Sequence, residues 1–138
     1  MQTTCFKIFL TGCLITLAGW VGAAVTEVDV RQGATLQSQG ALLIDVREPD
    51  EYAQGHAPGA RLIPLGQLQQ RLGEIAAHKN KPVALICRTG RRSAMAADIL
   101  NKAGFTQAVN VGGGMMVWQQ SGLPVVSGAA NKTTTAAQ

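Results

Sequence analysis

A thiol and three guanidinium groups lie close together in the segment Cys87-Arg88-Thr89-Gly90-Arg91-Arg92-Ser93. Arginine stays charged at every accessible pH, and a glycine allows a tight loop to aim several amide N–H groups at one point. Both effects favour a thiolate over a neutral thiol. The segment therefore predicts that Cys87 is a reactive cysteine, with a pKa below the value of about 8.5 of a free thiol.

This segment lies between a predicted strand and a predicted helix. Residues 83–86 form an apolar run that ends directly at Cys87, and residues 93–103 carry apolar side chains at helical spacing. Ligands bind at the carboxyl ends of strands in open α/β sheets. A helix N-terminus offers unpaired N–H groups and the positive end of the helix dipole. The position suits a small anionic substrate that is electrophilic at sulfur.

Strand and helix signals alternate along the rest of the chain. Residues 41–46 form a continuous apolar run, which is typical of a strand buried on both faces. The remaining predicted strands are 25–30, 61–63 and 108–111, and the predicted helices or turns are 32–39, 49–54, the stretch from 64 to the break at 80–82, and 115–120. This alternation predicts an α/β fold with a mostly parallel central sheet flanked by helices on both faces.

Composition narrows the class of protein. The chain has 138 residues, of which 46% are apolar, enough for the core of one domain. The net charge is +4, but three of the twelve basic residues lie within five residues of Cys87, and aromatic residues make up only 4%. A nucleic-acid-binding surface would spread basic residues over one face with aromatic residues between them. We therefore expect no nucleic-acid partner.

Residues 1–24 have the layout of a cleavable secretory signal peptide. Lys7 is the only charged side chain before Glu27, residues 8–21 are almost wholly apolar, and small residues follow at 22–24. One alternative is an uncleaved membrane anchor, because residues 8–25 are about long enough to cross a bilayer. Another is lipidation at Cys13, although the apolar run before it is short. The rest of the chain divides into a domain at 25–126 and a disordered tail at 127–138.

Removal of the signal peptide decides how many thiols remain. Cys5 and Cys13 would leave with it, so Cys87 would be the one thiol of the mature chain, in an oxidising compartment that is periplasmic or extracellular. A single cysteine cannot form an internal disulfide. The alternative is a buried, inert cysteine, but such a thiol would not need three arginines and a glycine directly after it.

Four segments, in order, resemble the rhodanese (thiosulfate sulfurtransferase) family. The loop from Cys87 to Arg92 matches the family pattern C-R-x-G-x-R/T. The other three segments are Asp45-Val46-Arg47, His56-Ala57-Pro58-Gly59-Ala60, and Gly113-Gly114 followed by Trp118. Together they extend over about residues 25–124. The length, leader and single domain resemble the small exported rhodaneses of bacteria, and the resemblance implies a rhodanese-like fold.

The resemblance also implies an activity. The Cys87 thiolate would take the outer sulfur of thiosulfate, release sulfite and become a persulfide, and cyanide or a thiol would then remove that sulfur. Arg88 favours thiosulfate over mercaptopyruvate as the donor. The amides of the loop would cradle the transferred sulfur, so the predicted substrate-binding residues are Arg88, Thr89, Gly90, Arg91 and Arg92.

Three further residues are predicted to support the loop. Asp45 would accept hydrogen bonds from amides or arginines, with an ordinary strand-end carboxylate as the alternative. Arg47 would support the loop in a similar way; the alternative is that it forms an ordinary surface ion pair with Glu48 or Glu51. His56 could act as a base, but in the resembling motif it shapes a turn.

The length of the loop distinguishes the rhodanese pattern from that of a second class of cysteine enzymes. Cysteine phosphatases and arsenate reductases use C-x5-R, a loop one residue longer that holds a tetrahedral oxyanion. Here Arg92 comes one position too early, and Ser93 occupies the sixth position after Cys87. The shorter loop suits a sulfur atom better than a phosphate.

The resemblance implies no metal and no organic cofactor. The expected partners are thiosulfate, cyanide or small thiols, and a thioredoxin-like acceptor protein. Contact with a membrane is expected only if the leader is retained. The chain is expected to be a monomer or weak dimer. A competing hypothesis is a persulfide carrier that serves one protein partner and turns over little free thiosulfate.

We predict that the exported protein begins near Ala24 or Val25. Intact mass of the protein purified from the periplasm or medium checks this start. A mass that includes the first 23 residues would contradict cleavage, and a mass with an added lipid would support the alternative at Cys13.

Overall fold

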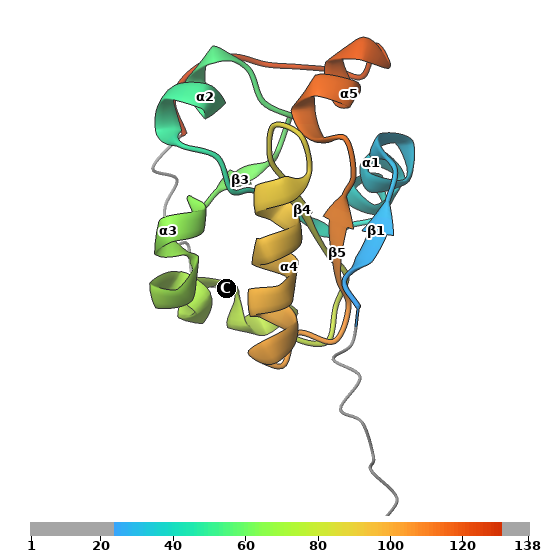
Figure 1. Ribbon diagram of the computed structural model, residues 1–138. Helices are drawn as coiled ribbons and strands as arrows, with labels where there is room; N and C mark the ends of the chain where they lie inside the picture. Colours follow the sequence, from blue (N-terminus) through green and yellow to red (C-terminus); the bar gives the residue numbers. More distant parts are fainter. Residues whose placement is uncertain (1–23, 131–138) are drawn as a thin grey trace, which may run out of the picture.

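Five parallel strands form one sheet in the order β1-β5-β4-β2-β3 (Figure 1). This computed structural model describes residues 24–130, so nearly all of the predicted signal peptide and residues 131–138 of the predicted tail lie outside the described residues. Among the described residues, no helix is long and apolar enough to cross a membrane. The strands are β1 (Thr26–Val28), β2 (Leu42–Asp45), β3 (Arg61–Leu62), β4 (Val83–Ile86) and β5 (Ala108–Val111).

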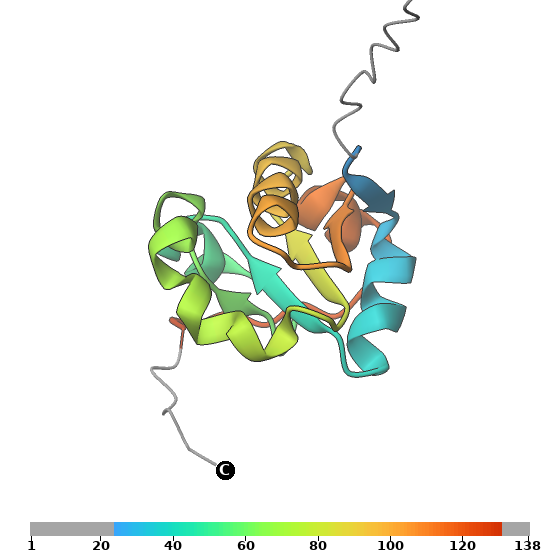
Figure 2. The ribbon, with the colours of Figure 1, turned by 90° about the horizontal axis from the view of Figure 1, so that it is seen from below.

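Helices cover both faces of the sheet, as the sequence predicted (Figure 2). One face packs against α3 (Leu65–Leu68), the 3-10 helix η1 (Gln69–His78) and α4 (Arg91–Lys102). The other packs against α1 (Val30–Ser38), α2 (Pro49–Gln54) and α5 (Gly114–Gln120).

The central strand β4 is apolar at every position because both of its faces are buried. Val83 and Leu85 belong to the core on the α4 side, and Ala84 and Ile86 belong to the core on the α1 and α5 side. All four are fully buried. This burial is the physical reason for a continuous apolar run in a parallel sheet, and it makes β4 a rigid base for Cys87 at its carboxyl end.

The segment after Pro64 differs from the single helix that the sequence predicted. It begins with the four-residue α3 and continues as the 3-10 helix η1. Gly66 and Gly73 weaken the preference of the segment for an α-helix, so core contacts decide its winding. Apolar side chains of the segment face the core: Leu68 and Ile75 are fully buried.

Two helices begin earlier than the sequence predicted. Helix α1 begins at Val30, because Asp29 caps it through a reciprocal capping box with Gln32. Helix α4 begins at Arg91, directly after Gly90 in a left-handed conformation. The early start of α4 brings its first amides to Cys87.

The described chain continues beyond residue 126, where the sequence placed the end of the domain. Val126 forms an antiparallel bridge with His56, and the amide of Gly128 donates to the carbonyl of Ala53 at 2.9 Å. Residues 126–128 therefore contact α2 and the loop after it.

Helix α5 holds the loop that carries Cys87. The amide of Met115 donates to the carbonyl of Cys87 at 2.7 Å, and the amide of Met116 donates to the carbonyl of Arg88 at 3.0 Å. Gly114, with φ of +57°, allows this approach, because a Cβ at this position would overlap both carbonyls. The Gly113-Gly114 motif thus fixes the distance between the loop and α5.

We predict that Gly114→Ala destabilises the protein more than Gly122→Ala does. Both glycines have positive φ, but an added Cβ at Gly122 would meet open space. Strain at positive φ costs about 1–2 kcal/mol, and overlap with the loop adds about 1–3 kcal/mol at Gly114 alone. Urea unfolding of the two variants checks the difference, and equal losses would contradict the role of Gly114 as a close-contact position.

Candidate active site

The sulfur of Cys87 lies buried at the carboxyl end of β4, in front of the N-terminus of α4. Cys87 is 1% exposed. The amide of Gly90 donates to Sγ at 3.1 Å, and the hydroxyl of Ser93 lies 3.3 Å from Sγ. No side chain caps α4, so the sulfur occupies the place where a helix N-cap usually accepts hydrogen bonds.

These hydrogen bonds decide the protonation of the sulfur. Burial by itself raises the pKa of the Cys87 thiol. The hydrogen bond from the Ser93 hydroxyl and those from the amides of Ser93, Thr89 and Gly90 lower it by more, so the pKa of Cys87 lies below its usual value. Donors that point at the sulfur favour the charged form. The structure therefore provides a buried site that favours the thiolate.

The loop arginines divide into one that is paired and two that are not. Arg92 forms a double hydrogen bond with the carboxylate of Glu51 on α2, at 2.7 and 2.8 Å. This contact with Arg92 holds the pKa of Glu51 at about 2, although partial burial opposes it. Arg88 and Arg91 are exposed, and neither forms an ion pair with any residue in the range 24–130.

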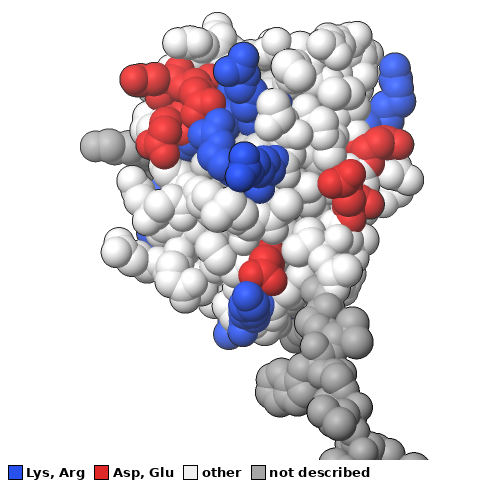
Figure 3. Space-filling view, in the orientation of Figure 1, with Lys and Arg blue, Asp and Glu red and all other residues white. Residues whose placement is uncertain are grey.

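Basic side chains gather over the loop and the start of α4, and acidic side chains gather beside them over α2 (Figure 3). Arg92 joins the two groups through its pair with Glu51. The guanidinium of Arg92 is therefore engaged with the protein, whereas Arg88 and Arg91 leave theirs available to an anion.

Asp45 and Arg47 form a buried pair with each other. Arg47 donates through its amide and its guanidinium to the carboxylate of Asp45, with the shortest contact at 2.7 Å, and also donates to the carbonyl of Gly55 at 2.8 Å. Arg47 therefore lies in a buried pair, and not in a surface pair with Glu48 or Glu51. The pair ties the end of β2 to the end of α2, beside the loop and not in contact with its amides.

His56 lies against Tyr52. The two rings stack with centroids 3.5 Å apart, and His56 Nδ1 lies 2.8 Å from the carbonyl of Tyr52. The backbone of His56 pairs with Val126. These contacts hold the turn after α2 against the C-terminal segment.

A shallow cavity lies beside the loop. It has a volume of about 450 Å³ and is lined by Arg88 together with residues at the end of α2 and on α5, among them Gln54, Met116 and Gln119. Arg88 thus lines, with Arg47 and Glu51, a space large enough for a small anion.

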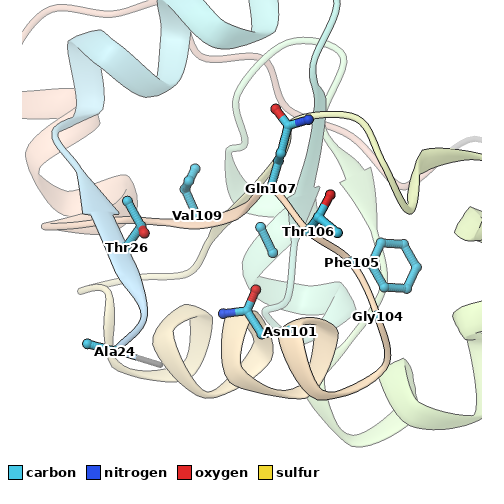
Figure 4. Close-up of a pocket in the computed structure, with 9 residues that line it drawn as sticks. Ala24, Thr26, Asn101, Gly104, Phe105, Thr106, Gln107 and Val109 are labelled. Carbon is cyan, nitrogen blue, oxygen red and sulfur yellow. The ribbon is translucent and has the colours of Figure 1, made fainter. Parts of the chain in front are cut away.

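A second cavity, of about 390 Å³, lies near the C-terminus of α4 and the start of β5 (Figure 4). Figure 4 shows Asn101, Thr106 and Gln107 around it. None of the described residues that line it has an ionisable side chain. It therefore offers no charged side chain to an ionic substrate. Across residues 24–130, no cluster of His, Cys, Asp and Glu could hold a metal ion.

Sequence reasoning named no role for Ser93, Asn110 or Glu27. Ser93 Oγ also lies 2.6 Å from Asn110 Oδ1, and Asn110 Nδ2 lies 3.1 Å from Glu27 Oε2. The position of Ser93 directly after the loop was a usable signal, because the first turn of a helix brings its side chains near the cap. Asn110 gave a weaker one, as a polar residue inside an apolar strand.

We predict that Ser93→Ala slows the alkylation of Cys87 at acidic and neutral pH. A hydrogen bond to a charged group contributes about 1.5–3 kcal/mol, so the rate should fall by roughly ten-fold or more. Iodoacetamide kinetics across a pH series measure this. Thr89→Ala is the matched control, because it removes an exposed hydroxyl from the same loop and keeps the amide. Equal rates in the Ser93 variant and wild type would show that the hydroxyl does not stabilise the thiolate.

The chain is similar in sequence to known proteins whose names refer to sulfur transfer or sulfur carriage. Over 70 residues the chain is 41% identical to the thiosulfate sulfurtransferase PspE of Escherichia coli, covering 51% of this chain and 67% of that protein. Over 76 residues it is 43% identical to the putative sulfur carrier protein YrkF of Bacillus subtilis, covering 55% of this chain and 40% of that protein.

A solved structure supports the fold. The crystal structure of a rhodanese-related protein from Thermoplasma volcanium superposes with a TM-score of 0.66 at 30% identity, covering 73% of this chain and 97% of that one. The sequence pattern of the rhodanese-like domain matches residues 29–121. With the Cys87 loop at the end of β4, this match shows that the chain belongs to the rhodanese family of sulfur-transfer proteins.

Proposed function

We propose that this protein is a thiosulfate sulfurtransferase that carries sulfur as a persulfide on Cys87. The observation that supports this most strongly is the set of hydrogen-bond donors around Sγ, in the same loop as the exposed and unpaired Arg88. The donors stabilise an anionic sulfur, and Arg88 lines a cavity beside the loop. The name of the relative PspE points to the same donor.

The first half-reaction moves one sulfur atom and one electron pair. The Cys87 thiolate attacks the outer sulfur of thiosulfate, a new S–S bond forms, and the S–S bond of thiosulfate breaks. Sulfite leaves with the electron pair of the broken bond. The product is a persulfide whose negative charge lies on its outer sulfur, and the amides of the loop that hold the thiolate suit this second anion as well.

The second half-reaction returns the thiolate. Cyanide, or the thiolate of an acceptor, attacks the outer sulfur of the persulfide, and Cys87 leaves as a thiolate. Thiocyanate or a new persulfide is the product. In the mature chain no second cysteine would be present to receive the sulfur, so the acceptor must come from outside.

Arginine at positions 88 and 91 provides the attraction for the dianion. Both side chains are exposed and unpaired among the described residues, and thiosulfate carries two negative charges. Arg92, by contrast, is held by Glu51 at 2.7 Å. We therefore assign Arg88 and Arg91 to substrate attraction and Arg92 to fixing the loop against α2.

A carrier that serves one protein partner is the second candidate. The name of the relative YrkF favours it. In this case a thioredoxin-like protein would be the acceptor. An exported location, periplasmic or extracellular, belongs to the proposal in either case.

Steady-state thiosulfate:cyanide kinetics test the proposed function. We expect turnover in wild type, none in Cys87→Ser, and a loss of roughly ten-fold or more in kcat/KM for thiosulfate in Arg88→Gln, because a charge-assisted contact contributes about 1.5–3 kcal/mol. Arg71→Gln is the matched control, since it makes the same charge change on η1. The ratio of kcat/KM in wild type to that in Arg88→Gln should fall towards one as salt screens the attraction.

The outcomes separate the two candidates. Negligible wild-type turnover with a persulfide still formed would favour the carrier. Equal kcat/KM in Arg88→Gln and Arg71→Gln would contradict the role of Arg88, and turnover in Cys87→Ser would contradict the persulfide on Cys87.

A further inference from the structure

Asn110 and Glu27 continue a chain of hydrogen bonds that ends on the sulfur of Cys87. Ser93 Oγ lies 2.6 Å from Asn110 Oδ1 and 3.3 Å from Cys87 Sγ. Asn110 Nδ2 lies 3.1 Å from Glu27 Oε2. Ser93 is fully buried and Asn110 is 2% exposed, whereas Glu27 lies at the surface. The chain therefore connects the buried sulfur to a surface carboxylate.

Cys87 and Asn110 compete for one proton. A serine hydroxyl has a single O–H donor, so Ser93 cannot donate to Cys87 Sγ and to Asn110 Oδ1 at the same time. Both acceptors lie within hydrogen-bond distance. The direction of the Ser93 hydroxyl therefore depends on which acceptor is stronger in each state of the sulfur.

Glu27 decides which atom Asn110 presents to Ser93. Glu27 and Asn110 are register partners on the neighbouring strands β1 and β5. A carboxylate has only acceptors, so the amide of Asn110 must turn its N–H group to Glu27. The amide oxygen then faces Ser93 and acts only as an acceptor there.

The charge on the sulfur sets the outcome of the competition. A neutral thiol, or the inner sulfur of a persulfide, is a weak acceptor, so the Ser93 proton goes to Asn110. A thiolate attracts the proton, and the buried oxygen of Asn110 then loses its donor. An unpaired buried acceptor is unfavourable. Asn110 therefore raises the free energy of the thiolate relative to both neutral forms of Sγ.

We propose that Asn110, oriented by Glu27, is a positioning residue that withdraws the Ser93 proton from Cys87 when Sγ is uncharged and thereby favours the sulfur-loaded protein over the free thiolate. The effect on the thiolate stands on geometry alone. The effect on loading rests on the proposed function. During loading, the thiolate gives its charge to the outer sulfur of the persulfide as sulfite leaves, and the Ser93 proton returns to Asn110.

Alkylation of Cys87 by iodoacetamide across a pH series tests the first part, without thiosulfate. Asn110→Leu removes the competing acceptor and keeps a side chain of similar shape. We expect alkylation at acidic pH to be faster than in wild type by roughly two- to ten-fold, the range that a net hydrogen bond contributes. Asn101→Leu, the same replacement near the other end of α4, is the matched control and should leave the profile unchanged.

The same replacements made in the Ser93→Ala protein distinguish an effect that acts through Ser93 from a through-space effect of charge. In Ser93→Ala, Asn110→Leu should have no effect, because the residue acts through the serine. Glu27→Gln, at an exposed position, gives Asn110 a partner that can donate as well as accept, so Asn110 is no longer forced to present its oxygen to Ser93. We expect this variant to accelerate alkylation when Ser93 is present and not in its absence. A through-space effect of charge would persist in both backgrounds. The other charges near the sulfur are the same in each pair compared: Arg88, Arg91, Arg92, Glu51 and Asp45.

Two results would overturn the inference. One is an equal acceleration with Ser93 and with Ser93→Ala. The other is that neither Asn110→Leu nor Glu27→Gln accelerates alkylation when Ser93 is present. Circular dichroism of each variant establishes that it is folded. If Asn110→Leu does not fold, Glu27→Gln decides the outcome.

The loading equilibrium tests the second part. At a fixed ratio of thiosulfate to sulfite, intact mass gives the fraction of protein that carries a persulfide. We expect the equilibrium constant for loading to fall by roughly two- to ten-fold in Asn110→Leu. Wild type that takes up no sulfur would contradict the proposed function and leave the alkylation result standing. Wild type that loads, with a variant that loads equally, would overturn the present inference instead.

Discussion

A sulfur atom that must be charged while buried is the constraint on which this site depends. Cys87 is almost fully enclosed, and an uncompensated anion in such a place would be unstable. The compensation comes from the amides of its own loop and from one hydroxyl, Ser93, which together lower the pKa of the thiol against the effect of burial. The amides of the loop are fixed dipoles, which need no rearrangement when a substrate enters.

The rest of the fold keeps those dipoles in place. Strand β4 has both faces buried and ends at Cys87, and α4 begins three residues after Arg88, so that its free amides face the sulfur. Helix α5 holds the carbonyls of Cys87 and Arg88 from the other side, and only a glycine at position 114 permits that approach. The pair between Arg92 and Glu51 attaches the loop to α2. Arg88 and Arg91 are the arginines of the loop that stay available for an anion.

Much of the fold could be predicted from local patterns. The apolar run before Cys87 and the run at 41–46 identified the two central strands, because strands buried on both faces have no polar side. The winding of the segment after Pro64 could not be predicted, since its glycines leave the choice between an α-helix and a 3-10 helix to core contacts. The nucleophile and the loop were visible because their chemistry is contiguous in sequence. The roles assigned to Arg88 and Arg91 remain predictions.

Contacts between segments that are distant in sequence could not be predicted from local patterns. Asn110 and Glu27 are separated by 83 positions and meet only because β1 and β5 are neighbours in register. The pairing of Arg92 with Glu51 spans 41 positions and depends on how α2 packs beside the loop. Asp45 and Arg47 are close in sequence, but their burial as a pair follows from the position of α2, which no local pattern reveals.

Intact mass before and after thiosulfate treatment shows whether Cys87 carries the transferred sulfur. We expect the protein to gain the mass of one sulfur atom, cyanide to remove it, and Cys87→Ala to gain nothing under the same conditions. The same adduct on Cys87→Ala would rule out a persulfide on Cys87, because the sulfur would then be carried by another group.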